Sequence, residues 1–90
     1  MNFTYNPNQI VLFHSDNNLL AEVTFPEVDH NTVDINHTFV DESLRGQGIA
    51  GQLMEAVAEQ LRAQGKKAIL TCSYAIKWFD QHPEYTDLVK

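Results

Sequence analysis

The sequence predicts an α/β (α+β) domain in which a mixed, mostly antiparallel sheet carries one main helix on a face. In the first 40 residues, Gln9–Phe13 is a compact β-branched and aromatic run, and Leu19–Phe25 and Thr32–Val40 alternate apolar with polar side chains, both patterns being typical of strands. From Gly48 to Gln64 the apolar side chains recur every three or four residues, which indicates an amphipathic helix. The 90 residues suffice for one small domain, so we interpret positions 1–90 as a single unit with the order β-β-β-α-β-α.

The first three strands are expected at Gln9–Phe13, Leu19–Phe25 and Thr32–Val40. A short run of turn-forming residues, Ser15-Asp16-Asn17-Asn18, joins the first two strands and predicts an antiparallel hairpin. Pro26 ends the second strand, because proline cannot donate to a ladder. Alternation along the third strand predicts one face with Val33, Ile35, His37 and Phe39 and another with Asp34, Asn36 and Thr38.

The main helix is followed by Gly65, which suits the left-handed position just past a helix C-terminus. A short apolar run at Ala68–Thr71 predicts a buried strand, which the strand-helix-strand order places parallel to an earlier strand. Ser73 is expected to cap a second helix from Tyr74 to about Asp80. His82-Pro83 breaks that helix, and Pro83 is expected to start a last turn.

The bulk composition excludes several classes of partner. The formal net charge is −6, with 12 acidic against 6 basic residues, whereas nucleic-acid binders rely on lysine and arginine. No apolar run is long enough to span a bilayer, and the first residues lack a signal-peptide pattern. The single cysteine, Cys72, fits a reducing compartment. We therefore expect a cytoplasmic protein with neither a nucleic-acid nor a membrane partner.

Three glycines lie where the main helix begins: Gly46, Gly48 and Gly51. A helix N-terminus has unpaired N–H groups and a partial positive charge, and glycine lets a phosphate approach the backbone closely. The pattern therefore predicts an anion site, with packing alone as the alternative role of the glycines. Their spacing also matches a dinucleotide fingerprint, but the next strand ends Leu70-Thr71-Cys72 without the required carboxylate. No Gly-Lys-Ser/Thr follows either, which excludes an ATP-type phosphate loop.

The segment around these glycines resembles a family motif. Arg45-x-x-Gly48-x-Ala50 is similar to the Q/R-x-x-G-x-G/A element of the GNAT superfamily of acyl-CoA-dependent N-acetyltransferases. The longer segment His37-Thr38-Phe39-Val40-Asp41-Glu42-Ser43-Leu44-Arg45-Gly46-Gln47-Gly48-Ile49-Ala50 looks like the H-T-x-V…L-R-G-x-G-I-G/A segment of its minimal, single-domain members. Cys72-Ser73-Tyr74-Ala75 and His82-Pro83-Glu84-Tyr85 are similar to two later elements of that subgroup, so the resemblance covers residues 9 to 89.

The resemblance implies a GNAT-like fold and a binding mode for acetyl-CoA. The CoA pyrophosphate would be held by the backbone across Arg45, Gly46, Gln47, Gly48, Ile49, Ala50 and Gly51. The pantetheine arm would pair with the strand edge at Phe39 and Val40, and Cys72 and Tyr74 would also contact the cofactor. The acyl thioester would lie where the third strand diverges from Ala68–Thr71.

The implied activity is transfer of an acetyl group from acetyl-CoA to a primary amine on a small molecule or a protein. A non-catalytic acyl-CoA-binding or sensor module is the alternative, because a short turn replaces the helices that build the acceptor pocket in larger GNAT enzymes. A third hypothesis is a small interaction domain whose glycine turn binds nothing. Absence of any affinity for CoA would support this third hypothesis.

Two residues are candidates for chemistry, His37 and Cys72. An imidazole can take the amine proton near neutral pH, so His37 is the candidate general base, although a hydrogen-bonded core histidine is the alternative. Cys72 is a candidate nucleophile, a site residue without a covalent role, or a small buried hydrophobe. The four histidines and Cys72 show no ligand-pair spacing, so no metal site is expected.

Overall fold

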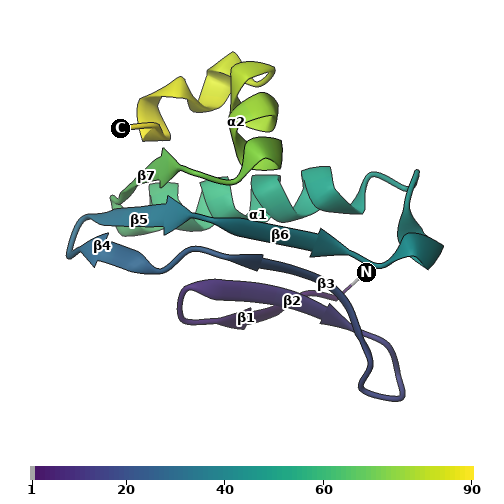
Figure 1. The fold of residues 1–90 in the computed structure, drawn as a ribbon. Helices are drawn as coiled ribbons and strands as arrows, with labels where there is room; N and C mark the ends of the chain where they lie inside the picture. The colour runs from purple at the N-terminus through teal and green to yellow at the C-terminus, as the bar shows by residue number, and fades with distance from the viewer. Residues whose placement is uncertain (1) are drawn as a thin grey trace.

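A twisted β-sheet in two sections forms the centre of the structure, a computed structural model that describes residues 2–90 (Figure 1). The antiparallel section has the order β1-β2-β3-β6, with β1 at Thr4–Asn6, β2 at Gln9–Phe13, β3 at Leu19–Thr24 and β6 at His37–Val40. The mixed section has the order β4-β5-β7, with β4 at Glu27–Asp29, β5 at Thr32–Ile35 and β7 at Lys67–Leu70. The helices are α1 at Ile49–Gln64 and α2 at Ser73–Asp80, and 3₁₀ turns lie at η1, Glu42–Leu44, and η2, Pro83–Leu88.

The pairing of the strands confirms the predicted mixed α/β fold. β2 and β3 form the expected antiparallel hairpin. β5 and β7 pair in parallel, with Val33 opposite Ala68 and Ile35 opposite Leu70. The connection between them passes through α1, as the strand-helix-strand order predicts.

The predicted third strand is in fact two strands with a break at Asn36. Val33 and Ile35 are buried before the break, but beyond it Thr38 is partly buried while His37 is exposed. The prediction that His37 and Phe39 share a face with Val33 was therefore wrong. Asn36 is one additional residue between two paired segments, and such a residue reverses which side chains face the core, as in a β-bulge. The Asn36 side chain accepts a hydrogen bond of 2.6 Å from Thr24 Oγ1.

Two short strands, β1 and β4, were missing from the predicted order. Each has three residues, all exposed, so neither shows the alternation by which a half-buried strand is recognised. Pro26 does follow β3, but β3 ends at Thr24 and the chain re-enters the sheet at once as β4. The short strands explain why the sheet is wider than the sequence predicted.

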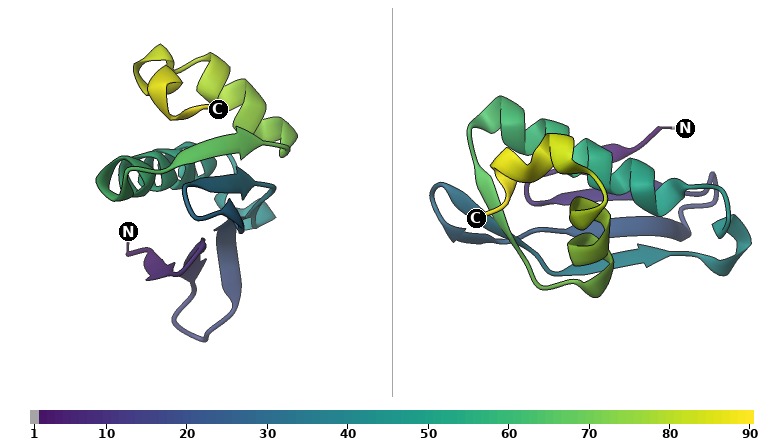
Figure 2. Two further views of the ribbon diagram at one scale, coloured as in Figure 1. Left: turned by 90° about the vertical axis from the view of Figure 1, so that its left-hand side faces the viewer. Right: turned by 90° about the horizontal axis from the view of Figure 1, so that it is seen from above.

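The core lies between one face of the sheet and the two helices. The apolar side chains that recur every three or four residues along α1 are all buried: Ile49, Leu53, Met54, Val57 and Leu61. The same cluster includes Ala75, Trp78 and Phe79 of α2. Figure 2 shows α1 lying along one face of the sheet, while the opposite face carries no helix within the described chain. No helix in residues 2–90 has the length and apolar character to cross a bilayer.

The start of α2 corrects a smaller expectation. Ser73 is the first residue of the helix and not its cap, because the preceding Cys72 occupies the N-cap position with φ −76° and ψ 126°. No side-chain hydrogen bond caps this end. Pro83 does open the last turn, η2, as predicted.

Leu53→Ala is expected to lower the free energy of unfolding by about 2–5 kcal/mol, because Leu53 is 0% exposed at the centre of the buried face of α1. Urea unfolding followed by circular dichroism measures the change. Glu55→Ala, at an exposed position on the same helix, should change it by only about 0.5 kcal/mol. A loss at Leu53 no larger than at Glu55 would contradict this description of the core.

Candidate functional site: a glycine turn at the start of the main helix

The chain between β6 and α1 turns through two glycines in the left-handed region. Gly46 has φ +84° and Gly48, the N-cap of α1, has φ +75°. A Cβ atom at either position would meet nothing within 4 Å. Packing therefore does not require glycine here, whereas the backbone conformation does, since a positive φ is costly for other residues.

Unpaired donors follow this turn directly. The first bond of α1 runs from the N–H of Gln52 to the carbonyl of Gly48, at 3.1 Å. The N–H groups of Ile49, Ala50 and Gly51 come before this bond in the chain. They therefore have no hydrogen-bond partner within the helix. They lie at the positive end of the helix dipole, and this end favours an anion.

The turn opens onto a cavity of about 230 Å³. Its lining contains eight of the eleven residues predicted to bind the cofactor: Val40, Arg45, Gly46, Gly48, Ile49, Ala50, Gly51 and Tyr74. Phe39, Gln47 and Cys72 do not line it. Leu44 does, and sequence reasoning missed it, although its place directly before Arg45 in the motif was the available signal. The structure thus brings most of the predicted binding residues to one hollow.

The far wall of this cavity comes from α2. A Cβ on Gly51 would lie 3.8 Å from the hydroxyl of Tyr74 and 3.5 Å from Nε1 of Trp78, so the two helices approach closely here. Partial burial raises the pKa of Tyr74 further above neutral pH, where an ordinary tyrosine is already protonated. The phenol is therefore available as a hydrogen-bond donor at the edge of the cavity.

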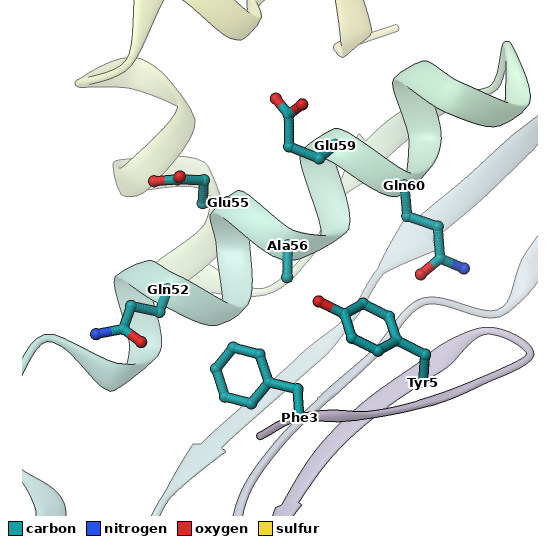
Figure 3. A pocket seen from close by; sticks show the side chains of 7 residues that line it. All are labelled: Phe3, Tyr5, Gln52, Glu55, Ala56, Glu59 and Gln60. Carbon is teal, nitrogen blue, oxygen red and sulfur yellow. The ribbon is translucent and has the colours of Figure 1, made fainter. Parts of the chain in front are cut away.

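A larger cavity, of about 560 Å³, lies elsewhere, between the start of the chain and α1. Figure 3 shows Phe3 and Tyr5 on one side of it and residues of α1 on the other. None of the predicted site residues lines it. Size alone therefore does not identify the cavity that matters, whereas the backbone donors of the glycine turn do.

Cys72 lies where β7 ends and the two sections of the sheet part. Its N–H donates to the carbonyl of Ile35 at 3.0 Å, and its Sγ donates to Oγ1 of Thr38 at 3.5 Å. The side chain is partly buried and packs against the core. Thr38 and Cys72 thus face each other at the divergence of β6 from β7, the position expected for the acyl thioester.

His37 lies on the opposite face of β6. Its side chain is 55% exposed, and its Nε2 is 3.5 Å from Oε1 of Glu22 on β3. The two candidate catalytic residues are therefore on different sides of the sheet, Cys72 toward the helices and His37 away from them. Within residues 2–90, no three His, Cys, Asp or Glu side chains gather as metal ligands would. The roles of His37 and Cys72 stay predictions.

Asp41 orders the approach to the glycine turn. It caps η1, accepting hydrogen bonds from the Ser43 hydroxyl at 2.6 Å and from the Ser43 N–H at 3.0 Å. These bonds to Ser43 lower the pKa of the Asp41 carboxyl from its usual 3.8. The carboxylate is therefore charged at neutral pH and holds the backbone that leads into the turn.

Acid is expected to loosen this turn. Because the pKa of Asp41 is lower in the folded chain than its usual 3.8, its contribution is complete above that value and is lost as pH falls through the folded one. Protonation should shift the amide resonance of Ser43 at a midpoint below pH 3.8. An NMR titration measures this shift, and Asp41→Asn should abolish it. A Ser43 resonance that titrates equally in both proteins would refute the assignment.

The sequence matches an established family over most of its length. The profile of the GCN5-related N-acetyl-transferase family matches residues 9–88. The Xenopus tropicalis protein NATD1 is 36% identical over 63 residues, covering 70% of this chain and 58% of that protein. NATD1 of Danio rerio is 35% identical over 71 residues, covering 77% and 64% respectively. The aligned region thus spans less than two thirds of these relatives. The chain belongs to the GCN5-related N-acetyltransferase family.

Solved structures share the fold. A GCN5-like protein from Staphylococcus aureus, solved by NMR, has a TM-score of 0.83 and 34% identity, over 99% of this chain and 87% of that one. A GNAT family acetyltransferase from Elizabethkingia anophelis with acetyl-CoA bound has a TM-score of 0.61 and 20% identity, over 86% of this chain and 51% of that one. At 20% identity the second structure supports the fold alone.

Proposed function

We propose that the chain binds acetyl-CoA and transfers its acetyl group to a primary amine. The observation that carries this proposal is the left-handed glycine turn, whose free N–H groups open onto a hollow. Its donor chemistry fits a pyrophosphate, since backbone donors and a helix N-terminus favour a multiply charged anion. Arg45 also lines this hollow, and an arginine guanidinium can bind two phosphate oxygens at once.

Two further observations support the remaining parts of the proposed binding mode. Val40, at the end of β6, lines the same cavity and would lie beside the pantetheine arm. The Thr38–Cys72 pair lies at the divergence of the sheet, where the thioester would be held. An acyl-CoA thioester supplies an activated acetyl group, and the chain then has to orient the amine and take up its proton.

His37 is our candidate for the proton acceptor. We expect the amine to approach from the uncovered face of the sheet, because α1 lies along the other face (Figure 2). His37 projects from the uncovered face of β6 and is exposed to solvent there. Cys72 stays a candidate nucleophile, a site residue without a covalent role, or a small hydrophobic side chain. Its thiol donates to Thr38 on the helix-covered side of the sheet.

A second candidate function is binding of acyl-CoA without catalysis. The observation in its favour is the connection between β2 and β3, which is a short turn and adds no element over the His37 face. The described chain therefore offers the amine a surface and not an enclosed pocket. Under this proposal the cofactor site is retained and the acceptor is absent or supplied by a partner.

Titration calorimetry of the purified chain with acetyl-CoA, and separately with CoA, tests the shared premise. We expect binding of one molecule per chain in the micromolar range. No heat of binding at millimolar ligand would overturn both functions. With binding established, incubation with acetyl-CoA and spermidine or a lysine-containing peptide, followed by mass spectrometry, separates the two. Acetylated amine supports the transferase, and binding without product supports the second candidate.

A further inference from the structure

A chain of polar side chains crosses the face of the sheet that no helix covers. The Asn6 amide donates to Oε1 of Gln9 at 3.0 Å, and the Gln9 amide donates to Oε2 of Glu22 at 2.6 Å. The other carboxylate oxygen of Glu22, Oε1, lies 3.5 Å from Nε2 of His37. The four residues come from β1, β2, β3 and β6, so the chain spans the whole antiparallel section.

Glu22 is an unusual residue for its position. It lies in the middle of the antiparallel section, directly between Val11 and Phe39 in the pairing register. Glutamate is depleted in strands, and removing a carboxylate from water is costly unless hydrogen bonds replace the lost solvent. The Glu22 side chain is only 18% exposed, whereas that of its neighbour His37 is 55% exposed. A residue that breaks the local rule at such a place often serves function.

The orientation of Gln9 is fixed by its own neighbour. Its Oε1 accepts from Asn6, which leaves Nε2 to face and donate to Glu22. That bond occupies one carboxylate oxygen and turns the other toward His37. Glu22 Oε1 is therefore held as a hydrogen-bond acceptor that faces one ring nitrogen of His37, Nε2.

We propose that Glu22 is the positioning residue for His37. Its carboxylate holds the proton of the neutral imidazole on Nε2, and this leaves the lone pair of Nδ1 directed to solvent as the proton acceptor. This inference rests on the proposed transferase function. As the amine nitrogen forms its bond to the acyl carbon, the carbon–sulfur bond breaks and CoA leaves as the thiolate. The proton lost by the amine goes to Nδ1, and the resulting imidazolium faces the Glu22 carboxylate.

The tautomer of His37 tests the inference without any substrate. A long-range ¹H–¹⁵N correlation spectrum at pH about 8 distinguishes a proton on Nε2 from one on Nδ1. We expect Nε2–H in the natural chain. In Glu22→Gln the new amide can donate to Nε2, so the proton should move to Nδ1 in most molecules. Glu55→Gln removes the same charge at an exposed position of α1 and should leave the His37 pattern unchanged.

Turnover gives the second readout. Glu22→Gln should lower acetyl transfer to spermidine by roughly tenfold or more, while the dissociation constant for acetyl-CoA stays the same. An amide fingerprint spectrum of the variant shows that it is folded. A His37 pattern in Glu22→Gln that matches the natural chain would overturn the positioning role. Full turnover in His37→Ala would instead overturn the base assignment, while the tautomer still reports on the Glu22–His37 pair.

Discussion

Replacing Gly48 by valine should weaken acetyl-CoA binding by a factor on the order of 100 or more. Gly48 has φ +75°, and a β-branched side chain in this conformation is strongly disfavoured. A Cβ there would meet nothing within 4 Å, so the valine side chain would extend into the space beside the cavity. Both effects act where the free N–H groups of the first helical turn would meet a pyrophosphate. Titration calorimetry with acetyl-CoA measures the result.

The other end of α1 provides a matched control. Gly65, the C-cap, also has a left-handed conformation, with φ +69°, and a Cβ there would likewise meet nothing within 4 Å. Gly65→Val should therefore destabilise the chain about as much as Gly48→Val, and thermal unfolding checks that the two losses match. Gly65 is outside the cavity, so its variant should bind acetyl-CoA normally. Equal loss of binding in both variants would show that general instability, and not the turn, explains the effect.

His37→Ala should lower the rate of acetyl transfer by roughly 10²- to 10⁴-fold, the usual contribution of a general base. The affinity for acetyl-CoA should be unchanged, because His37 projects from the face of β6 opposite the cavity and does not line it. Steady-state kinetics with spermidine, together with calorimetry, separates the two quantities.

His30→Ala is the control for this substitution, since His30 lies in the exposed turn between β4 and β5. It should leave both the rate and the affinity unchanged. If His37→Ala reduced affinity and turnover together, His37 would be a structural residue of the sheet. The transferase proposal would then need another proton acceptor.

The change in hydrophobic period made the centre of the fold predictable. The inward positions of α1 and the β2–β3 hairpin were clear because each buries one regular stripe of side chains. The parallel pairing of β5 with β7 followed from the helix between them. Most of the residues proposed to bind the cofactor at the turn could also be predicted, since they are close together in the chain, and all of residues 45–51 except Gln47 line one cavity.

The features that the sequence did not predict depend on contacts between segments that are distant in the chain. β1 and β4 are exposed along their whole length, so pairing with neighbouring strands defines them and no pattern of their own does. The break at Asn36 has no composition signal, yet it decides which face His37 occupies. The contact between Glu22 and His37 could not be predicted either, because it depends on the register between β3 and β6.

The parting of the sheet at Asn36 and Cys72 has a consequence for the range of acceptors. Under the proposed function, the helix-covered side receives the nucleotide and the bare side receives the amine, so the two reactants have separate entrances. The cavity at the start of α1 would then limit the size of the cofactor and not the size of the amine. A lysine on the surface of an intact folded protein could reach His37 as readily as a free polyamine. Selectivity would therefore depend on the shape and charge of the acceptor's exterior.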